Sequence, residues 1–115
     1  MNTTVESVVI REVKEVIRLT GIKLQRINTG NFKGHYKTAN AGTLDFEGYD
    51  KRGRFCAIEC KRPDGGRLSP EQAERIADIN RAGGVAFVAH SGKEAMELLQ
   101  RNGCIGLVAV GGVTV

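Results

Sequence analysis

The 115-residue sequence lacks several features that would set its class at once. No apolar run approaches the length of a membrane span, so we expect no transmembrane segment. The polar residues 1–4 do not form a secretory signal, and we expect a soluble, cytoplasmic protein. Internal repeats and a second domain are also absent. Residues 1–115 are therefore predicted to form a single domain with a modest core.

Cysteine is scarce, and its pattern excludes two kinds of small protein. Only Cys56, Cys60 and Cys104 are present, and no C-x-x-C occurs. His35 and His90 are the only histidines that could join them as ligands. This odd number of cysteines in apolar segments argues against a zinc site and against a disulfide framework. We expect buried free thiols.

The overall composition is that of an ordinary globular protein. Hydrophobic residues make up 41% and charged residues 26% of the chain, which argues against disorder. The net charge of +4 makes a polyanionic partner plausible but is weak evidence for one.

The most informative stretch, residues 42–61, is predicted to form two strands joined by a turn at residues 50–53. Side chains alternate along a strand, so Glu59 and Lys61 share one face with Phe55 and Ala57. Cys56, Ile58 and Cys60 share the other face. Asp45 precedes the turn at a spacing that allows it to lie across the hairpin beside Glu59.

Two carboxylates and a lysine at the edge of a sheet suit a divalent cation and a phosphate. The simpler alternative is that Glu59 and Lys61 form an ion pair at a strand end, with Asp45 as a turn residue. The spacing of Asp45 and a second signal downstream favour a functional site.

Residues 5–19 are predicted to form an amphipathic helix that ends at Gly21. Glu6 falls within the apolar stripe, Glu12 lies at its border and Glu15 points away. An inward carboxylate on the first turn needs a partner, which a metal site would supply. Alternatively, Glu6 lies at a frayed, hydrated helix end. The pattern favours neither reading.

A strand is predicted at residues 22–29, followed by a long loop at residues 30–42. The composition of this loop suits phosphate binding and base stacking, because it contains Phe32, Lys33, His35, Tyr36 and Lys37. The alternative is a solvated loop with anchoring aromatic residues.

The second half of the chain begins with a basic, turn-rich loop at residues 62–68. A helix follows, with Ser69 as N-cap, Pro70 in the first turn and Gln72 completing a capping box. Gln72 also faces inward, although capping alone would explain it. A buried strand is predicted at residues 85–89, and a helix capped by Ser91 follows.

Residues 104–115 are apolar and are predicted to form a final strand or a contact with another subunit. The element order is thus α-β-β-β-α-β-α-β. It predicts an α/β fold in which a mixed sheet is flanked by helices and polar groups gather at one end.

Four features along nearly the whole chain resemble the PD-(D/E)XK nuclease superfamily, and within it the small stand-alone phage or bacterial form of the VRR-NUC family. They are Glu6, Gly42-x-x-Asp45, Glu59-Cys60-Lys61 and Ser69-Pro70-x-Gln72. Leu44 stands where many members have the proline of the motif name. The resemblance implies a restriction-endonuclease-like fold.

The resemblance also implies a metal site, in which Asp45 and Glu59 ligate Mg²⁺ or Mn²⁺ and the backbone carbonyl of Cys60 is a further ligand. Glu6 would reach the metal directly or through water. Lys61 would orient or activate the attacking water. In the same pattern Gln72 would position the lysine or the substrate.

The function expected from this resemblance is metal-dependent hydrolysis of DNA by a homodimer acting on branched DNA, such as Holliday junctions. We expect the nucleic acid to contact the basic loops, through Lys33, His35, Tyr36, Lys37, Arg62 and Arg67. Two alternatives stay open. One is a DNA-binding module with an idle nuclease site, and the other is an RNA nuclease on the same scaffold.

Overall fold

The computed structural model describes residues 5–27 and 42–106. Within them, a mixed sheet with strand order β1-β2-β3-β4 is flanked by helices. The elements are α1 (Glu6–Thr20), β1 (Lys23–Arg26), β2 (Phe46–Tyr49), β3 (Phe55–Cys60), α2 (Pro70–Arg81), β4 (Val85–Ala89) and α3 (Gly92–Arg101). Neighbouring strands from β1 to β3 are antiparallel, and β4 is parallel to β3. The predicted α/β class is confirmed.

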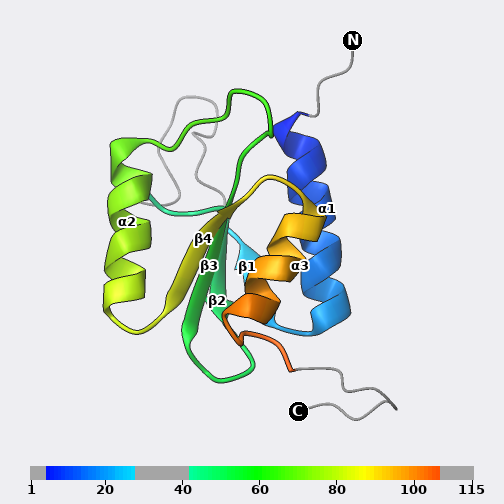
Figure 1. Cartoon of the computed structure of the whole chain (residues 1–115), viewed down its shortest axis with the longest axis vertical. Coiled ribbons are helices and arrows are strands. Elements are labelled where there is room, and N and C mark those ends of the chain that lie inside the picture. Colours follow the sequence, from blue (N-terminus) through cyan, green and yellow to red (C-terminus); the bar gives the residue numbers. More distant parts are fainter. Residues whose placement is uncertain (1–4, 28–41, 107–115) are drawn as a thin grey trace.

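The helices divide between the two faces of the sheet. Helix α2 covers one face, and α1 and α3 cover the other (Figure 1). Strand β3 lies between them and is apolar on both sides, as a central strand should be. Its residues Cys56, Ile58 and Cys60 pack into the core beneath α1 and α3. Ala57 packs with Leu44 and the buried residues of α2 and β4. The predicted alternation of β3 is therefore confirmed.

Two strand predictions need adjustment. Strand β2 begins at Phe46, so Asp45 precedes the strand, although the Ile27 N–H still donates to the Asp45 carbonyl at 2.8 Å. Strand β1 ends at Arg26, and residues 28–29 of the predicted strand lie outside the described residues.

The predicted last strand is wrong for its first residues, 104–106. The Cys104 N–H donates to the Leu99 carbonyl, and the Cys104 carbonyl accepts from the Lys51 N–H. The segment therefore closes the end of α3 and bonds to the β2–β3 turn instead of extending the sheet. Residues 107–115 lie outside the described part. No helix in the described ranges has the length and apolar character to cross a membrane.

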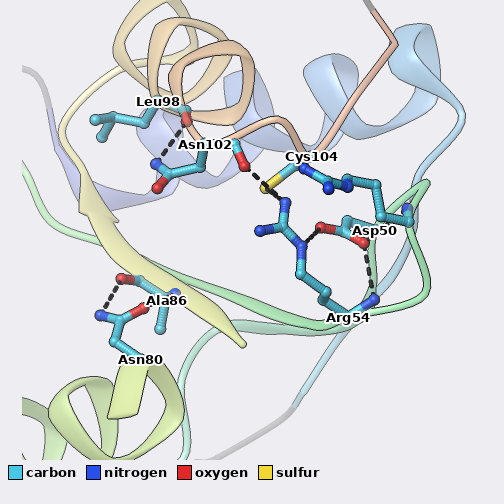
Figure 2. Close-up of polar contacts among 8 residues, drawn as sticks. Asp50, Arg54, Asn80, Ala86, Leu98, Asn102 and Cys104 are labelled. Carbon is cyan, nitrogen blue, oxygen red and sulfur yellow. Dashed lines mark hydrogen bonds and ion pairs between the residues drawn. The ribbon is translucent and has the colours of Figure 1, made fainter. Parts of the chain in front are cut away.

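The outer edge of β4 is protected by a side chain of α2. The Asn80 amide donates to the Ala86 carbonyl at 3.0 Å and accepts from the Ala86 N–H at 2.9 Å (Figure 2). Because the amide imitates a neighbouring strand, it satisfies backbone groups that would otherwise be open to pairing with another chain.

A buried aspartate holds the β2–β3 turn together. Asp50 is 2% exposed, and its Oδ1 accepts hydrogen bonds from the backbone N–H groups of Arg52 and Arg54. Its Oδ2 accepts from Nε of Arg54 at 2.9 Å (Figure 2). The other end of the Arg54 guanidinium donates to the Asn102 carbonyl at 2.6 Å and to Sγ of Cys104 at 3.9 Å. One carboxylate thus connects the turn to the end of α3.

Burial alone would raise the pKa of Asp50, but hydrogen bonds from Arg54 and Arg52 outweigh it and hold this pKa below its ordinary value. The folded structure therefore favours the ionised carboxylate, and the turn depends on its charge.

We expect Asp50→Ala to lower the free energy of unfolding by about 2–4 kcal/mol, because it leaves two backbone donors and a half-buried guanidinium without their acceptor. Urea denaturation at neutral pH measures the loss. The control is Asp78→Ala, which removes an exposed ion pair with Arg81 and should change stability by about 0.5 kcal/mol or less. Equal losses in the two variants would contradict the role given to Asp50.

Candidate active site

Two carboxylates meet where β2 begins and β3 ends. Asp45 is 7% exposed and Glu59 is 2% exposed. Each carboxylate binds the backbone of the other's strand. The Asp45 N–H donates to Oε1 of Glu59 at 3.2 Å, and the Cys60 N–H donates to Oδ2 of Asp45 at 2.8 Å. We call this reciprocal pair of bonds the carboxylate latch. It fixes two acidic side chains next to each other with little access to water.

Lys61 and Gln72 both bind the second oxygen of Glu59. The Lys61 ammonium lies 3.0 Å from Oε2, and Nε2 of Gln72 donates to the same atom at 2.9 Å. Lys61 follows directly after β3, and its N–H continues the ladder to the Ala89 carbonyl of β4. The structure therefore brings together four of the residues selected from the sequence, Asp45, Glu59, Lys61 and Gln72.

Gln72 both completes the capping box of α2 and faces inward, toward Glu59. Its Oε1 accepts from the Ser69 N–H at 3.0 Å, while its own N–H donates to Oγ of Ser69 at 3.0 Å, which completes the capping box. Its Nε2 is then directed at Glu59. Because the cap fixes the amide oxygen, the orientation of the amide nitrogen is fixed as well. The first turn of α2 is thereby anchored to the acidic pair.

The structure adds a residue that the sequence reasoning missed. Arg26, the last residue of β1, places Nη2 3.8 Å from Oδ1 of Asp45. Nothing in the local pattern of residues 22–29 marks Arg26 as different from the other basic residues. Only the pairing of Arg26 with Phe46 across β1 and β2 brings it beside Asp45.

The surroundings of Glu59 disfavour its charge. Burial and the neighbouring Asp45 carboxylate raise the pKa of Glu59 from its ordinary value of 4.5 to about 7, although the hydrogen bond and the charge of Lys61 oppose this shift. A cation placed between the two carboxylates would remove the repulsion that contributes to it.

The first helix carries two glutamates that the sequence could not fully separate. Glu12 is exposed, and its Oε1 accepts from the Gly92 N–H at 2.9 Å, at the start of α3. Glu6 is half-buried and is the first residue of α1. The start of α1 and the ends of β3 and β4 lie toward the same end of the molecule (Figure 1). The charge of Glu6 acts on Cys60, whose pKa is raised first by burial, then by Asp45 and Glu59, and also by Glu6. Glu12 therefore has a structural partner, whereas the charge of Glu6 acts on Cys60, the residue that follows Glu59.

The predicted nucleic-acid contacts are only partly within the described residues. Arg62 and Arg67 are exposed in the loop that follows β3. The remaining four, Lys33, His35, Tyr36 and Lys37, lie outside the described residues.

The donor atoms of the site suit a hard divalent cation. Within residues 5–27 and 42–106, no three His, Cys, Asp or Glu side chains converge closely enough to hold a metal ion, so Glu6 is not placed as a third direct ligand. Mg²⁺ in proteins often binds one or two carboxylates and fills its other positions with water and substrate oxygen. Asp45 and Glu59 supply the two carboxylates of that pattern.

The raised pKa of Glu59 predicts how stability depends on pH. Between about pH 4.5 and pH 7 the folded protein binds more protons at Glu59 than the unfolded chain does, so the free energy of unfolding falls as the pH rises. Glu59→Gln removes this contribution. We expect urea denaturation in EDTA to show that wild-type protein loses more stability than Glu59→Gln between about pH 4.5 and pH 8. Equal losses of stability in the two proteins would contradict the raised pKa of Glu59.

The comparisons with known proteins address the fold. No protein-family model matches the sequence, and no curated protein matches it. Among solved structures, one described as "VRR_NUC domain" is similar to this chain with a TM-score of 0.59 and 21% sequence identity. The match covers 83% of this chain and 94% of that chain. The fold of the chain is therefore that of a VRR_NUC domain.

Proposed function

We propose that the protein is a metal-dependent endonuclease that hydrolyses phosphodiester bonds in DNA. The observation that carries the proposal is the carboxylate latch, which keeps Asp45 and Glu59 together, with the Lys61 ammonium 3.0 Å from Glu59. Buried acids that repel one another reduce stability, and such groups cluster at functional sites. Mg²⁺ or Mn²⁺ binding is the use that best accounts for them.

The reaction places definite demands on these residues. Water attacks the phosphorus, the bond from phosphorus to the 3′-oxygen breaks, and the products are a 5′-phosphate and a 3′-hydroxyl. When bound, the divalent ion supplies Lewis acidity and offsets the charge of the phosphate. Asp45 and Glu59 hold that ion, together with the Cys60 carbonyl.

Lys61 supplies a positive charge that does not depend on the metal. Its side chain is 13% exposed, so the field of its ammonium is less screened than that of a surface lysine. In the proposed reaction it orients the attacking water and stabilises the extra negative charge at the phosphate. Gln72 is fixed by the cap of α2. Its bond to Glu59 holds that carboxylate in place beside Lys61.

Glu6 is proposed to act through water at the edge of the site, since no three His, Cys, Asp or Glu side chains in the described residues lie close enough to hold a metal ion. DNA docks on the exposed Arg62 and Arg67 and on the loop at residues 30–42. Branched DNA and a homodimer are part of the proposal, because a chain this small has little surface with which to span a junction alone.

The primary test is cleavage of labelled four-way junction, flap and linear duplex DNA in Mg²⁺, Mn²⁺ or EDTA. We expect metal-dependent cutting of the junction by the wild-type protein. Asp45→Ala and Lys61→Ala should each reduce the rate by about 10²-fold or more, because the first removes a proposed metal ligand and the second removes a positive charge that stabilises the transition state. Lys61→Ala should still bind metal and DNA.

Three outcomes would contradict parts of this proposal. Tight DNA binding without cutting, unaffected by EDTA or by Asp45→Ala, would support a binding module with an idle site. Faster cutting of a matched RNA would reassign the substrate. Wild-type turnover by Lys61→Ala would remove the role given to the lysine.

Substitutions of Glu6 and Glu12 should have different effects in the same assay. Glu6→Gln should slow cleavage by about tenfold or more with unchanged thermal stability, because it removes a charge that acts on Cys60, the residue that follows Glu59. Glu12→Gln is the matched control. It should slow cleavage much less and should lower the melting temperature, since it weakens the bond to Gly92. The reverse order of rates would show that Glu12 is the acid of the site.

A further inference from the structure

Arg26 is the second cation beside the acidic pair. Its Nη2 lies 3.8 Å from Oδ1 of Asp45, which is within ion-pair range but too long for a hydrogen bond. The other oxygen of Asp45 is already bonded to the Cys60 N–H at 2.8 Å. Arg26 therefore faces Oδ1 at ion-pair distance, and the contact between them is loose.

The guanidinium of Arg26 is held at this position by other groups. Its Nη1 donates to the Ile27 carbonyl at 3.2 Å, and its central carbon lies 5.9 Å from the centre of the Phe46 ring. Such contacts hold a guanidinium in place at little entropic cost. The side chain is nevertheless 38% exposed. Arg26 is thus positioned by its own strand and by β2 and does not depend on Asp45 for its position.

The charge balance of the site changes when a metal ion binds. Without metal, the carboxylates of Asp45 and Glu59 are balanced by Arg26 and Lys61. A divalent ion between the carboxylates would neutralise them by itself. The two side-chain cations would then be in excess, next to a site that must receive an anionic phosphate.

From this we infer that Arg26 is a phosphate-binding residue of the site, which competes with the metal ion for Asp45 when DNA is absent and binds a DNA phosphate when the metal is present. The inference rests on the proposed function. A guanidinium suits the second role because its planar donors match two phosphate oxygens.

The first test measures Mn²⁺ affinity by calorimetry without DNA, so it does not depend on activity. Arg26→Gln should bind Mn²⁺ about threefold to tenfold more tightly than the wild type, because a competing charge has been removed. The control is Lys23→Gln on the same strand, which removes an equal charge opposite Tyr49, away from Asp45. It should leave the affinity unchanged.

The second test measures junction-DNA binding by proteins that also carry Lys61→Ala, so that the DNA stays intact. With Mn²⁺, Arg26→Gln should weaken binding about tenfold and reduce the salt slope by about one, whereas Lys23→Gln should change neither. In EDTA, where Asp45 retains Arg26, the loss should be about twofold or less. Arg26→Lys, which keeps the charge but not the planar fork, should lie between wild type and Arg26→Gln in Mn²⁺.

The outcomes separate this inference from the function on which it rests. If the wild-type protein binds no Mn²⁺, the metal-dependent function fails, and the inference fails with it. If the wild type binds Mn²⁺ and Arg26→Gln matches it in both metal affinity and DNA binding, only the inference is overturned. A merely structural Arg26 would lower the melting temperature of Arg26→Gln and would not tighten Mn²⁺ binding, which also overturns it.

Discussion

The carboxylate latch is the interaction on which the rest of the site depends. It exists because β2 and β3 pair with Phe46 opposite Ile58, which places Asp45 next to Glu59 just beyond the ladder. A slip of one residue in this register would turn Glu59 toward the core beneath α1 and α3 and would separate the acids. The Lys61 and Gln72 contacts would be lost with it, since both converge on Glu59. Strand register thus sets the chemistry of the site.

Much of the site was predictable because it follows from local rules. The alternation along β3 places Glu59 on the face opposite to the cysteines. It places Lys61 on the same face as Glu59. The capping box at the start of α2 places Gln72 in the first turn. Each of these inferences needs only a few neighbouring residues and the geometry of one element. The fold class followed from the same patterns, because the order of helices and strands restricts how the sheet can form.

The remaining features depend on contacts between distant segments, which local patterns do not determine. Arg26 reaches Asp45 only through the pairing of β1 with β2, although the two residues are far apart in the sequence. The bond from Gly92 to Glu12 joins residues on different helices and decides which glutamate of α1 is already engaged. The apolar composition of residues 104–115 suggested a strand, but the bonds of Cys104 to α3 and to the β2–β3 turn take priority over sheet pairing.

The Asp50 and Arg54 contacts lie at one end of the β2–β3 hairpin, and the acidic pair lies at the other. A strand of the length of β3 spans roughly 17 Å, so neither cluster touches the other. The two ends of the hairpin should therefore tolerate different mutations. Residues around the acids can diverge toward new substrates while the turn maintains the fold. Stabilising changes near the turn can likewise offset destabilising changes that new activities require.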